Sequence, residues 1–225
     1  GLILIDAAAE FKMYSSDVTR TFPVNGKFTK VQQDVYTEVL KAQEIGIKNV
    51  TTKKTMSDIH TSTVASISQS LVDLGLVPMG VEETISMMHY FEFFMHGTGH
   101  WLGLDVHDAG TTEEKNKPRK LKPGMVTTIE PGIYIRPNKP EIEFKLLERD
   151  PKKIRERRKS LGMEKATKLE SEEMKDAKSI KHKIPKDLLG IGIRIEDDIV
   201  CTENDPINLT IGAPKTIDDV EAICS

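Results

Sequence analysis

Cysteine, aromatic residues, long hydrophobic runs and net charge are all scarce in this sequence of 225 residues. The two cysteines, Cys201 and Cys224, exclude a disulfide scaffold and a four-cysteine zinc site. No apolar run approaches the roughly 20 residues of a membrane-spanning helix, so we expect no membrane partner. The net charge of −3 gives no general reason to expect nucleic acid. The composition, 38% hydrophobic and 30% charged, is typical of a folded chain that is long enough to bury a core.

The chain opens on an apolar run, Leu2–Ile5, with no initiator methionine and no polar residues before it. This run predicts a buried strand. Because chains rarely begin inside a core strand, we expect a fragment that lacks its upstream part. A targeting signal would lie in that part, so the sequence leaves the cellular location open.

Hydrophobic periodicity predicts a mixture of strands and helices. Valines at four-residue spacing predict a helix over 30–50. A second helix is expected over 56–74, with Ser57 as its N-cap and Gly75 at its end. The other expected elements are strands at 2–6, 18–22, 125–135 (broken at Pro131-Gly132) and 191–201, and a short helix at 216–223.

One segment is unusually rich in charge. Residues 143–187 hold 15 Lys/Arg and 10 Asp/Glu, which leaves the rest of the chain with 17 basic and 25 acidic residues, a net charge of −8. We interpret residues 137–188 as a solvated insertion, at most partly helical and without strands, that lies outside the body of the fold. A basic patch for RNA or anionic lipid is the alternative, although the interleaved acids would weaken it.

Four acids and one histidine lie in or beside apolar runs: Asp6, Asp17, His100, Glu130 and Glu196. Two strands joined by a turn can place Asp6 and Asp17 side by side, and adjacent buried carboxylates are costly unless a cation holds them. Carboxylates with one imidazole suit a pair of divalent ions such as Mn²⁺, Co²⁺, Fe²⁺ or Zn²⁺. Such a pair would hold a bridging hydroxide and polarise a carbonyl group.

Each acid also has an ordinary structural alternative. Asp17 could cap a turn. Asp6 could form an ion pair with Arg20. Glu196 could form an ion pair with Arg194. A single acid at a strand end is more often one of these than a metal ligand, so spacing alone leaves both interpretations open.

Four motifs follow one another along the chain: residues 4–24, which contain Leu-Ile-Asp-Ala-Ala-Ala-Glu and Ser-Asp-Val-Thr-Arg-Thr-Phe-Pro-Val, then Phe94–Asp108, Thr128–Tyr134 and Gly192–Asp198. In this order they resemble the pita-bread metallopeptidases, and most closely aminopeptidase P, the Xaa-Pro aminopeptidases of the mitochondrial type. The resemblance covers 1–135 and 189–225. It implies an α+β pita-bread fold, a curved and mostly antiparallel sheet covered by helices and incomplete at its N-terminus. Residues 1–225 would then be the C-terminal catalytic part of such an enzyme.

The resemblance implies that five residues bind two divalent metal ions, for which we expect Mn²⁺. Asp6 and Asp17 match the two aspartate ligands. His100 matches the single histidine ligand. Glu130 and Glu196 match the two glutamate ligands, and we expect Asp17 and Glu196 to bridge the ions. Glu130 also matches the catalytic residue that handles protons around the bridging hydroxide.

Four further residues match positions around the substrate. His107 and His96 match active-site histidines with catalytic and substrate-binding roles. Tyr134 and Arg194 match positions that order the ligands or the substrate.

The remaining histidines match nothing firm in the family. We expect His60 and His182 to face solvent and His89 to lie near the mouth of the pocket. Ala8 departs from the family, which usually has glycine there. If that glycine serves a positive φ, Ala8 would be strained.

The implied activity is a metal-dependent exopeptidase that releases the N-terminal residue from peptides with proline in second position. A proline dipeptidase is the alternative, because those enzymes also carry extra residues before the last glutamate ligand. An inactive peptide-binding module of the same fold is another. Expected partners are peptides with Xaa-Pro N-termini, the candidate assembly is a homodimer, and the expected location is mitochondrion or cytoplasm. Without an upstream region, we expect the 225 residues to bind metal weakly or fold poorly, and to cleave slowly.

Overall fold

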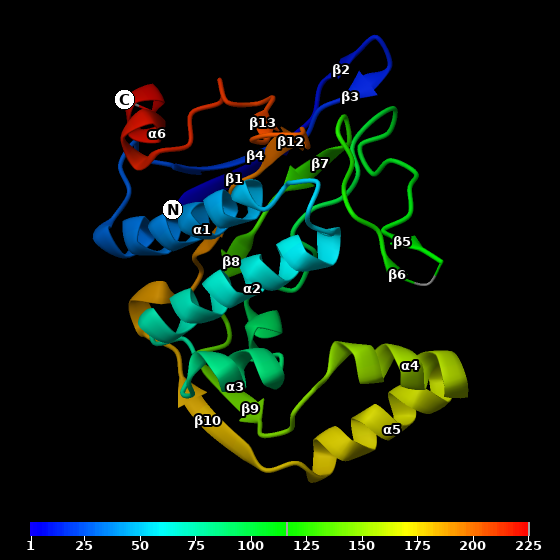
Figure 1. The fold of residues 1–225 in the computed structure, drawn as a ribbon. Helices are drawn as coiled ribbons and strands as arrows, with labels where there is room; N and C mark the ends of the chain where they lie inside the picture. Colours follow the sequence, from blue (N-terminus) through cyan, green and yellow to red (C-terminus); the bar gives the residue numbers. More distant parts are fainter. Residues whose placement is uncertain (116, 225) are drawn as a thin grey trace.

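Helices and short strands alternate along the chain in the computed structural model, which describes residues 1–115 and 117–224 (Figure 1). The helices are α1 (Lys30–Lys48), α2 (Met56–Asp73), α3 (Val81–Ser86), η1 (His89–Glu92), α4 (Pro151–Leu161), α5 (Met163–Asp176), η2 (Lys186–Leu188) and α6 (Ile217–Ile223). The strands are β1 (Leu2–Ala7), β2 (Glu10–Phe11), β3 (Tyr14–Ser15), β4 (Val18–Pro23), β5 (Glu113–Glu114), β6 (Lys117–Pro118), β7 (Val126–Ile129), β8 (Gly132–Tyr134), β9 (Glu141–Lys145), β10 (Ser179–Lys183), β11 (Gly192–Arg194), β12 (Asp197–Val200) and β13 (Ile207–Asn208). Within the described residues, no helix is long and apolar enough to cross a membrane.

The strands pair antiparallel in small sheets. β1 pairs with β4, β8 with β11, and β12 with both β7 and β13. Further hydrogen bonds join β4 to the segment around β11 and β12. The amide of Glu196 donates to the carbonyl of Thr19 over 3.1 Å, and the amide of Arg194 donates to Thr21 Oγ1 over 3.2 Å. Segments from near both ends of the chain therefore lie side by side.

Helices α1 and α2 contribute much of the core, which includes the fully buried Tyr36, Ile67 and Leu71. Both helices occupy the predicted ranges. α2 begins at a capping box formed by Thr55 and Asp58, so the cap lies two residues before the predicted one. The helix is followed by a glycine with a φ of +66°, a conformation that glycine adopts without strain.

A buried charge network holds β4 to the C-terminal part of the chain. Arg20 is 4% exposed and its Nη2 donates to Asp197 Oδ1 over 2.6 Å, while Asp197 itself is fully buried. The other carboxylate oxygen of Asp197 accepts hydrogen bonds from Lys215 Nζ at 2.7 Å and Gln43 Nε2 at 2.8 Å. The alternative in which Arg20 pairs with Asp6 is therefore wrong. Burial of this arginine is tolerable because its charge is fully paired.

β1 differs from the predicted buried strand. Ile3 is 49% exposed and Ile5 is 48% exposed. The strand pairs with β4 on one side and has no second partner strand among the described residues. The strand itself is confirmed, whereas its burial is not.

The charged segment is more ordered than predicted. Its outer parts form the antiparallel pair β9–β10, and its middle forms the helices α4 and α5. Ile142 and Phe144 of β9 are buried in the main core, at 5% and 3% exposed. Within α4 and α5, by contrast, Ala166 is the single buried residue. The expectation of a strand-free segment is therefore wrong, whereas the solvated character of its helical part is confirmed.

Candidate metal centre

Three side chains from distant parts of the chain converge on one point. Ligand atoms of Asp17, His100 and Glu196 lie within 4.8 Å of one another. Asp17 directly precedes β4, His100 lies in the loop after η1, and Glu196 lies between β11 and β12. These separations are in the range set by metal–ligand distances of about 2.0–2.6 Å. Three of the predicted ligands are thus brought together where strands from both ends of the chain meet the loop that carries His100.

His100 directs its ring nitrogen Nε2 to this point. Its Nδ1 donates to the carbonyl of Trp101 over 3.0 Å, and a carbonyl can only accept. In the neutral imidazole, Nε2 is then the nitrogen that carries the free lone pair. It lies 3.4 Å from Asp17 Oδ2 and 3.6 Å from Glu130 Oε1. Metal-binding histidines are commonly oriented in this way, by a hydrogen bond from the other ring nitrogen to a backbone carbonyl that also fixes the tautomer.

The two glutamates of the cluster are oriented by threonines. Thr128 Oγ1 donates to Glu130 Oε1 over 3.3 Å. Thr19 Oγ1 donates to Glu196 Oε2 over 2.5 Å. Glu130, at the end of β7, thereby joins the other three predicted ligands through its approach to His100.

Asp6 is the predicted ligand that lies apart from these four. Its Oδ2 accepts a hydrogen bond from Arg194 Nη2, and its side chain is 50% exposed. Asp6 is nevertheless near enough to Asp17 to help raise the pKa of that carboxyl. Among the residues described, the acid that pairs with Arg194 is therefore Asp6 and not Glu196.

Burial raises the pKa of the clustered carboxyls. For Asp17, burial acts first and the neighbouring Asp6 adds to it. Burial also raises the pKa of Glu130. Burial and then the charge of Glu130 raise the pKa of Glu196 to about 8. A bound divalent cation would offset both the desolvation and the repulsion, so this donor set fits such an ion.

Asp198 is a further acid at the centre that our sequence analysis missed. Its Oδ2 accepts a hydrogen bond from the amide of Asp17 over 3.1 Å. Burial raises the pKa of Asp198 to about 6. This hydrogen bond holds the backbone of Asp17 in place. Asp198 is not one of the residues whose ligand atoms converge. Its place directly after the Ile-Glu-Asp run was the only signal available in the sequence.

The residues predicted to surround the substrate lie next to this cluster. His96 Nε2 accepts a hydrogen bond from the Tyr134 hydroxyl over 2.8 Å, because its Nδ1 donates to the carbonyl of Gly97. Arg194 Nη1 lies 3.4 Å from the same hydroxyl. The ring of His107 lies 4.2 Å from that of His100, centroid to centroid. All four residues are thus within contact of a predicted ligand or of each other.

The other histidines are not where the sequence suggested. His60, on α2, is partly buried, and its Nδ1 lies 2.9 Å from Thr98 Oγ1 in the loop that carries His100. His182 is partly buried, and its Nε2 donates to the carbonyl of Gly75. Their expected solvent exposure is wrong. His89 is 8% exposed and packs on Phe144 of β9, so it is a core residue and not part of a pocket mouth.

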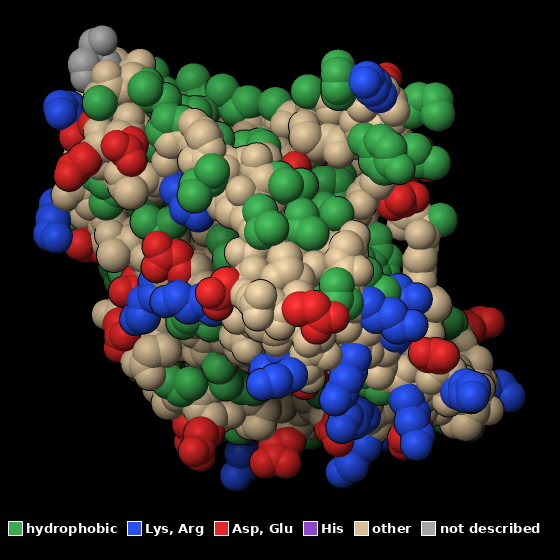
Figure 2. All heavy atoms as spheres, turned by 45° about the horizontal axis from the view of Figure 1, so that its top comes forward, with side chains coloured by type: hydrophobic (Ala, Val, Ile, Leu, Met, Phe, Trp, Pro, Cys, Tyr) green, Lys and Arg blue, Asp and Glu red, His purple; other side chains and the backbone are tan. Residues whose placement is uncertain are grey.

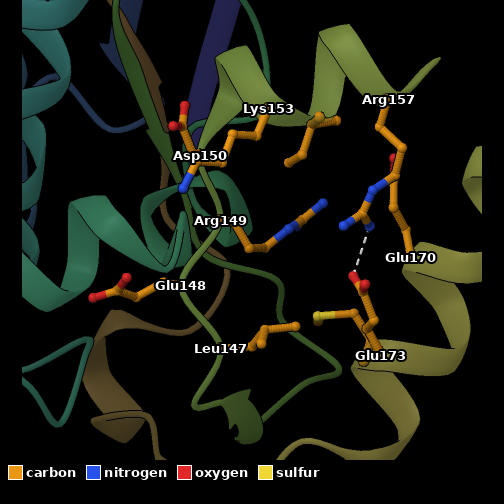
Figure 3. Close-up of a pocket in the computed structure, with 10 residues that line it drawn as sticks. Leu147, Glu148, Arg149, Asp150, Lys153, Arg157, Glu170 and Glu173 are labelled. Atoms are coloured by element: carbon orange, nitrogen blue, oxygen red, sulfur yellow. Dashed lines mark hydrogen bonds and ion pairs between the residues drawn. The ribbon is translucent and has the colours of Figure 1, made fainter. Parts of the chain in front are cut away.

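Two cavities adjoin the cluster. One of about 560 Å³ is lined by His100, Trp101 and His107. Another of about 830 Å³ is lined by His96 and by residues of α2, η1 and the start of α4. A smaller cavity of about 160 Å³ lies apart, between α4 and α5, where Arg157 pairs with Glu173 over 2.7 Å (Figure 3). An ion pair between the two helices crosses it, so it is a feature of helix packing.

Ala8 does not have a positive φ, so the condition under which it would be strained is not met. The non-glycine residues with positive φ in the described part of the chain are Lys12, Met13, Met88 and Lys115. Position 8 therefore does not require glycine here.

Buried carboxylates around one imidazole, held by antiparallel strand pairs under helices, form a donor set for divalent metal in a protein of the pita-bread fold. The chain belongs to metallopeptidase family M24, whose sequence profile matches residues 1–203. Its membership of a metallopeptidase family supports divalent metal binding, and the cluster of acids and a histidine is a donor set that could hold such an ion.

Similar proteins are named for one activity. The chain is 38% identical over 220 residues to an Xaa-Pro aminopeptidase of Haemophilus influenzae, covering 98% of this chain and 41% of that protein. It is 33% identical to human Xaa-Pro aminopeptidase 3, covering 100% of this chain and 35% of that protein. The aminopeptidase PepP of Pseudomonas aeruginosa has a similar structure, with a TM-score of 0.77 and 37% identity over 99% of this chain and 41% of that one. The chain thus spans about two fifths of the length of these relatives.

Proposed function

We propose that this chain is the catalytic part of a metal-dependent exopeptidase that releases the N-terminal residue from peptides with proline in second position. The convergence of Asp17, His100 and Glu196, with Glu130 beside them, is the observation that carries the proposal. An inactive binding module would have no reason to hold costly buried carboxylates together. The names of the relatives support the same activity.

The residues of the cluster could hold the metal ions that this metal-dependent amide hydrolysis requires. A bound pair of divalent ions, for which we propose Mn²⁺, would supply an activated water and polarise the carbonyl group. Asp6, Asp17, His100, Glu130 and Glu196 would hold these ions. The tertiary amide before proline has no N–H and is sterically restricted, which makes a dedicated site chemically reasonable.

Proton transfer and orientation would fall to neighbouring side chains. Glu130, with its raised pKa, is suited to accept a proton from the attacking water and to return it to the leaving nitrogen. The hydrogen bond from Tyr134 to His96 fixes that ring toward the cavity. His107 lines the cavity of about 560 Å³ beside His100 and is placed to contact the peptide. Arg194 adds a positive charge that stabilises the surrounding carboxylates.

Hydrolysis of Ala-Pro-Pro, with Ala-Ala-Pro as the comparison substrate, tests this function. We expect release of alanine from Ala-Pro-Pro in Mn²⁺, no release in EDTA, and little from Ala-Ala-Pro. Asp17→Asn should abolish the activity. Its matched control, Asp205→Asn, changes an exposed aspartate and should retain it. Preferential cleavage of the dipeptide Ala-Pro would instead favour a proline dipeptidase, and the absence of cleavage in any metal would contradict the proposal.

A further inference from the structure

The two cavities beside the metal centre are parts of one cleft. Both are lined by the same five residues: Ser57, His60, Gly97, Pro118 and Arg155. The smaller part, about 560 Å³, contains the cluster histidine His100. The larger part, about 830 Å³, leads away from it between α2, η1 and the start of α4. A volume of this size is in the range that holds a drug-sized molecule.

The walls of the larger part are mainly apolar. Its lining includes Val64 of α2, Ile85 of α3, and Met88, Phe91 and Met95 around η1. Phe91 is 50% exposed and Met95 is 42% exposed, so large apolar side chains face solvent beside the loop that carries His100. Exposed apolar surface that is continuous with a catalytic centre is typical of a binding groove.

The start of α4 closes this cleft on one side. Asp150 caps the helix by accepting a hydrogen bond from the amide of Lys152, and both residues line the larger part. Arg155 Nη1 forms an ion pair of 2.9 Å with Glu113 of β5, which links α4 to the opposite rim. Lys and Arg side chains gather at the lower right of Figure 2, on the side where Figure 1 draws α4 and α5. The charged segment thus supplies a polar rim to an apolar floor.

We infer that this cleft binds the part of the substrate that follows the cleaved bond, and that it selects oligopeptides with large apolar residues after the proline. The inference rests on the proposed function, because the cleft continues from the histidines assigned to the reaction. The apolar side chains of the leaving peptide would lie on Phe91 and Met95, and its backbone would face the polar rim formed by α4. A dipeptide would leave the larger part of the cleft empty.

The test compares Ala-Pro-Leu-Leu with Ala-Pro-Ser-Ser on the full chain in Mn²⁺. We expect kcat/KM to be about tenfold higher for the leucine peptide, as the burial of one partly covered leucine would give. Phe91→Asp should remove most of this preference, and so should Met95→Ser, which serves if the first variant unfolds. Ile211→Asp is the matched control, because Ile211 is 80% exposed and lies outside the residues that line the cleft. It should keep the wild-type ratio.

Binding is measured separately, so that the result does not depend on turnover. Fluorescence anisotropy of both peptides, dye-labelled at their C-termini and titrated with metal-free protein in EDTA, should show a Kd about tenfold lower for the leucine peptide. If Ala-Pro-Pro is cleaved but both tetrapeptides react and bind equally, in wild type and in Phe91→Asp, the inference is overturned while the proposed function stands. If no peptide is cleaved, the proposed function fails, and the anisotropy ratio still decides whether the cleft selects apolar peptides.

Discussion

Replacement of Glu196 by glutamine should make the metal-free protein more stable at alkaline pH while weakening its hold on metal. Glu196 is 1% exposed, and burial with the charge of Glu130 raises its pKa to about 8 from a usual value of 4.5. For an acid with a raised pKa, the folded state favours the protonated form. Its contribution to stability is therefore complete below pH 4.5 and is lost as the pH rises through about 8.

The size of this effect follows from the two pKa values. At 1.36 kcal/mol per pKa unit, ionisation of this one group removes about 3 to 4 kcal/mol of stability between pH 5 and pH 8. Glutamine cannot ionise, and its side-chain oxygen can still accept the hydrogen bond from Thr19. The free energy of unfolding of Glu196→Gln should thus fall less over this pH range, by about that amount.

Urea unfolding in EDTA, followed by circular dichroism at pH 5, 6, 7 and 8, measures this difference. Glu203→Gln, at an exposed position, is the matched control and should follow the wild type. Saturating Mn²⁺ should stabilise the wild type most at pH 8, because binding requires deprotonated carboxylates, and should stabilise Glu196→Gln much less. Equal loss of stability with pH in wild type and Glu196→Gln would refute the reasoning.

Gly99→Ala should destabilise the chain by about 1–3 kcal/mol in urea unfolding, since the added Cβ would lie 1.8 Å from the carbonyl oxygen of Thr128; an unchanged midpoint would show that the loop can move away. His100→Ala should weaken Mn²⁺ binding by at least about tenfold in calorimetric titration, and unchanged affinity would remove this residue from the ligand set. Tyr134→Phe deletes the hydroxyl that donates to His96 and should lower kcat by about tenfold, with unchanged Mn²⁺ affinity. A parallel loss of Mn²⁺ affinity would mean that Tyr134 acts on the metal centre itself.

Elements with a strong local pattern could be predicted from the sequence. The helices over 30–48 and 56–73 combine apolar spacing with capping residues, and both are found nearly as predicted. The predicted strand over 191–201 is instead interrupted between β11 and β12, where Glu196 turns into the centre. β9 was missed although Ile142 and Phe144 alternate with charged residues, which is the period of a half-buried strand.

The candidate site could be predicted in composition but not in arrangement. Four of the five expected ligands cluster because the motifs that carry them determine both residue type and neighbouring strands. The orientation of Asp6 depends on Arg194, which is 188 residues away, and no local pattern reports it. The place of His60 likewise depends on how α2 packs against the loop of Thr98. The homodimer and the location in mitochondrion or cytoplasm stay predictions.

The buried pair of Arg20 and Asp197 constrains how the chain can fold during synthesis. The two residues are 177 positions apart, so roughly 10–35 s separate their synthesis at 5–20 residues per second. Throughout that interval the β1–β4 hairpin cannot bury its arginine without leaving an unpaired charge. The β1–β4 hairpin must therefore stay solvated until the segment that carries Asp197 has left the ribosome. Stalled or prematurely terminated translation before Asp197 should yield a product whose first strands never dock, and which chaperones and proteases would engage.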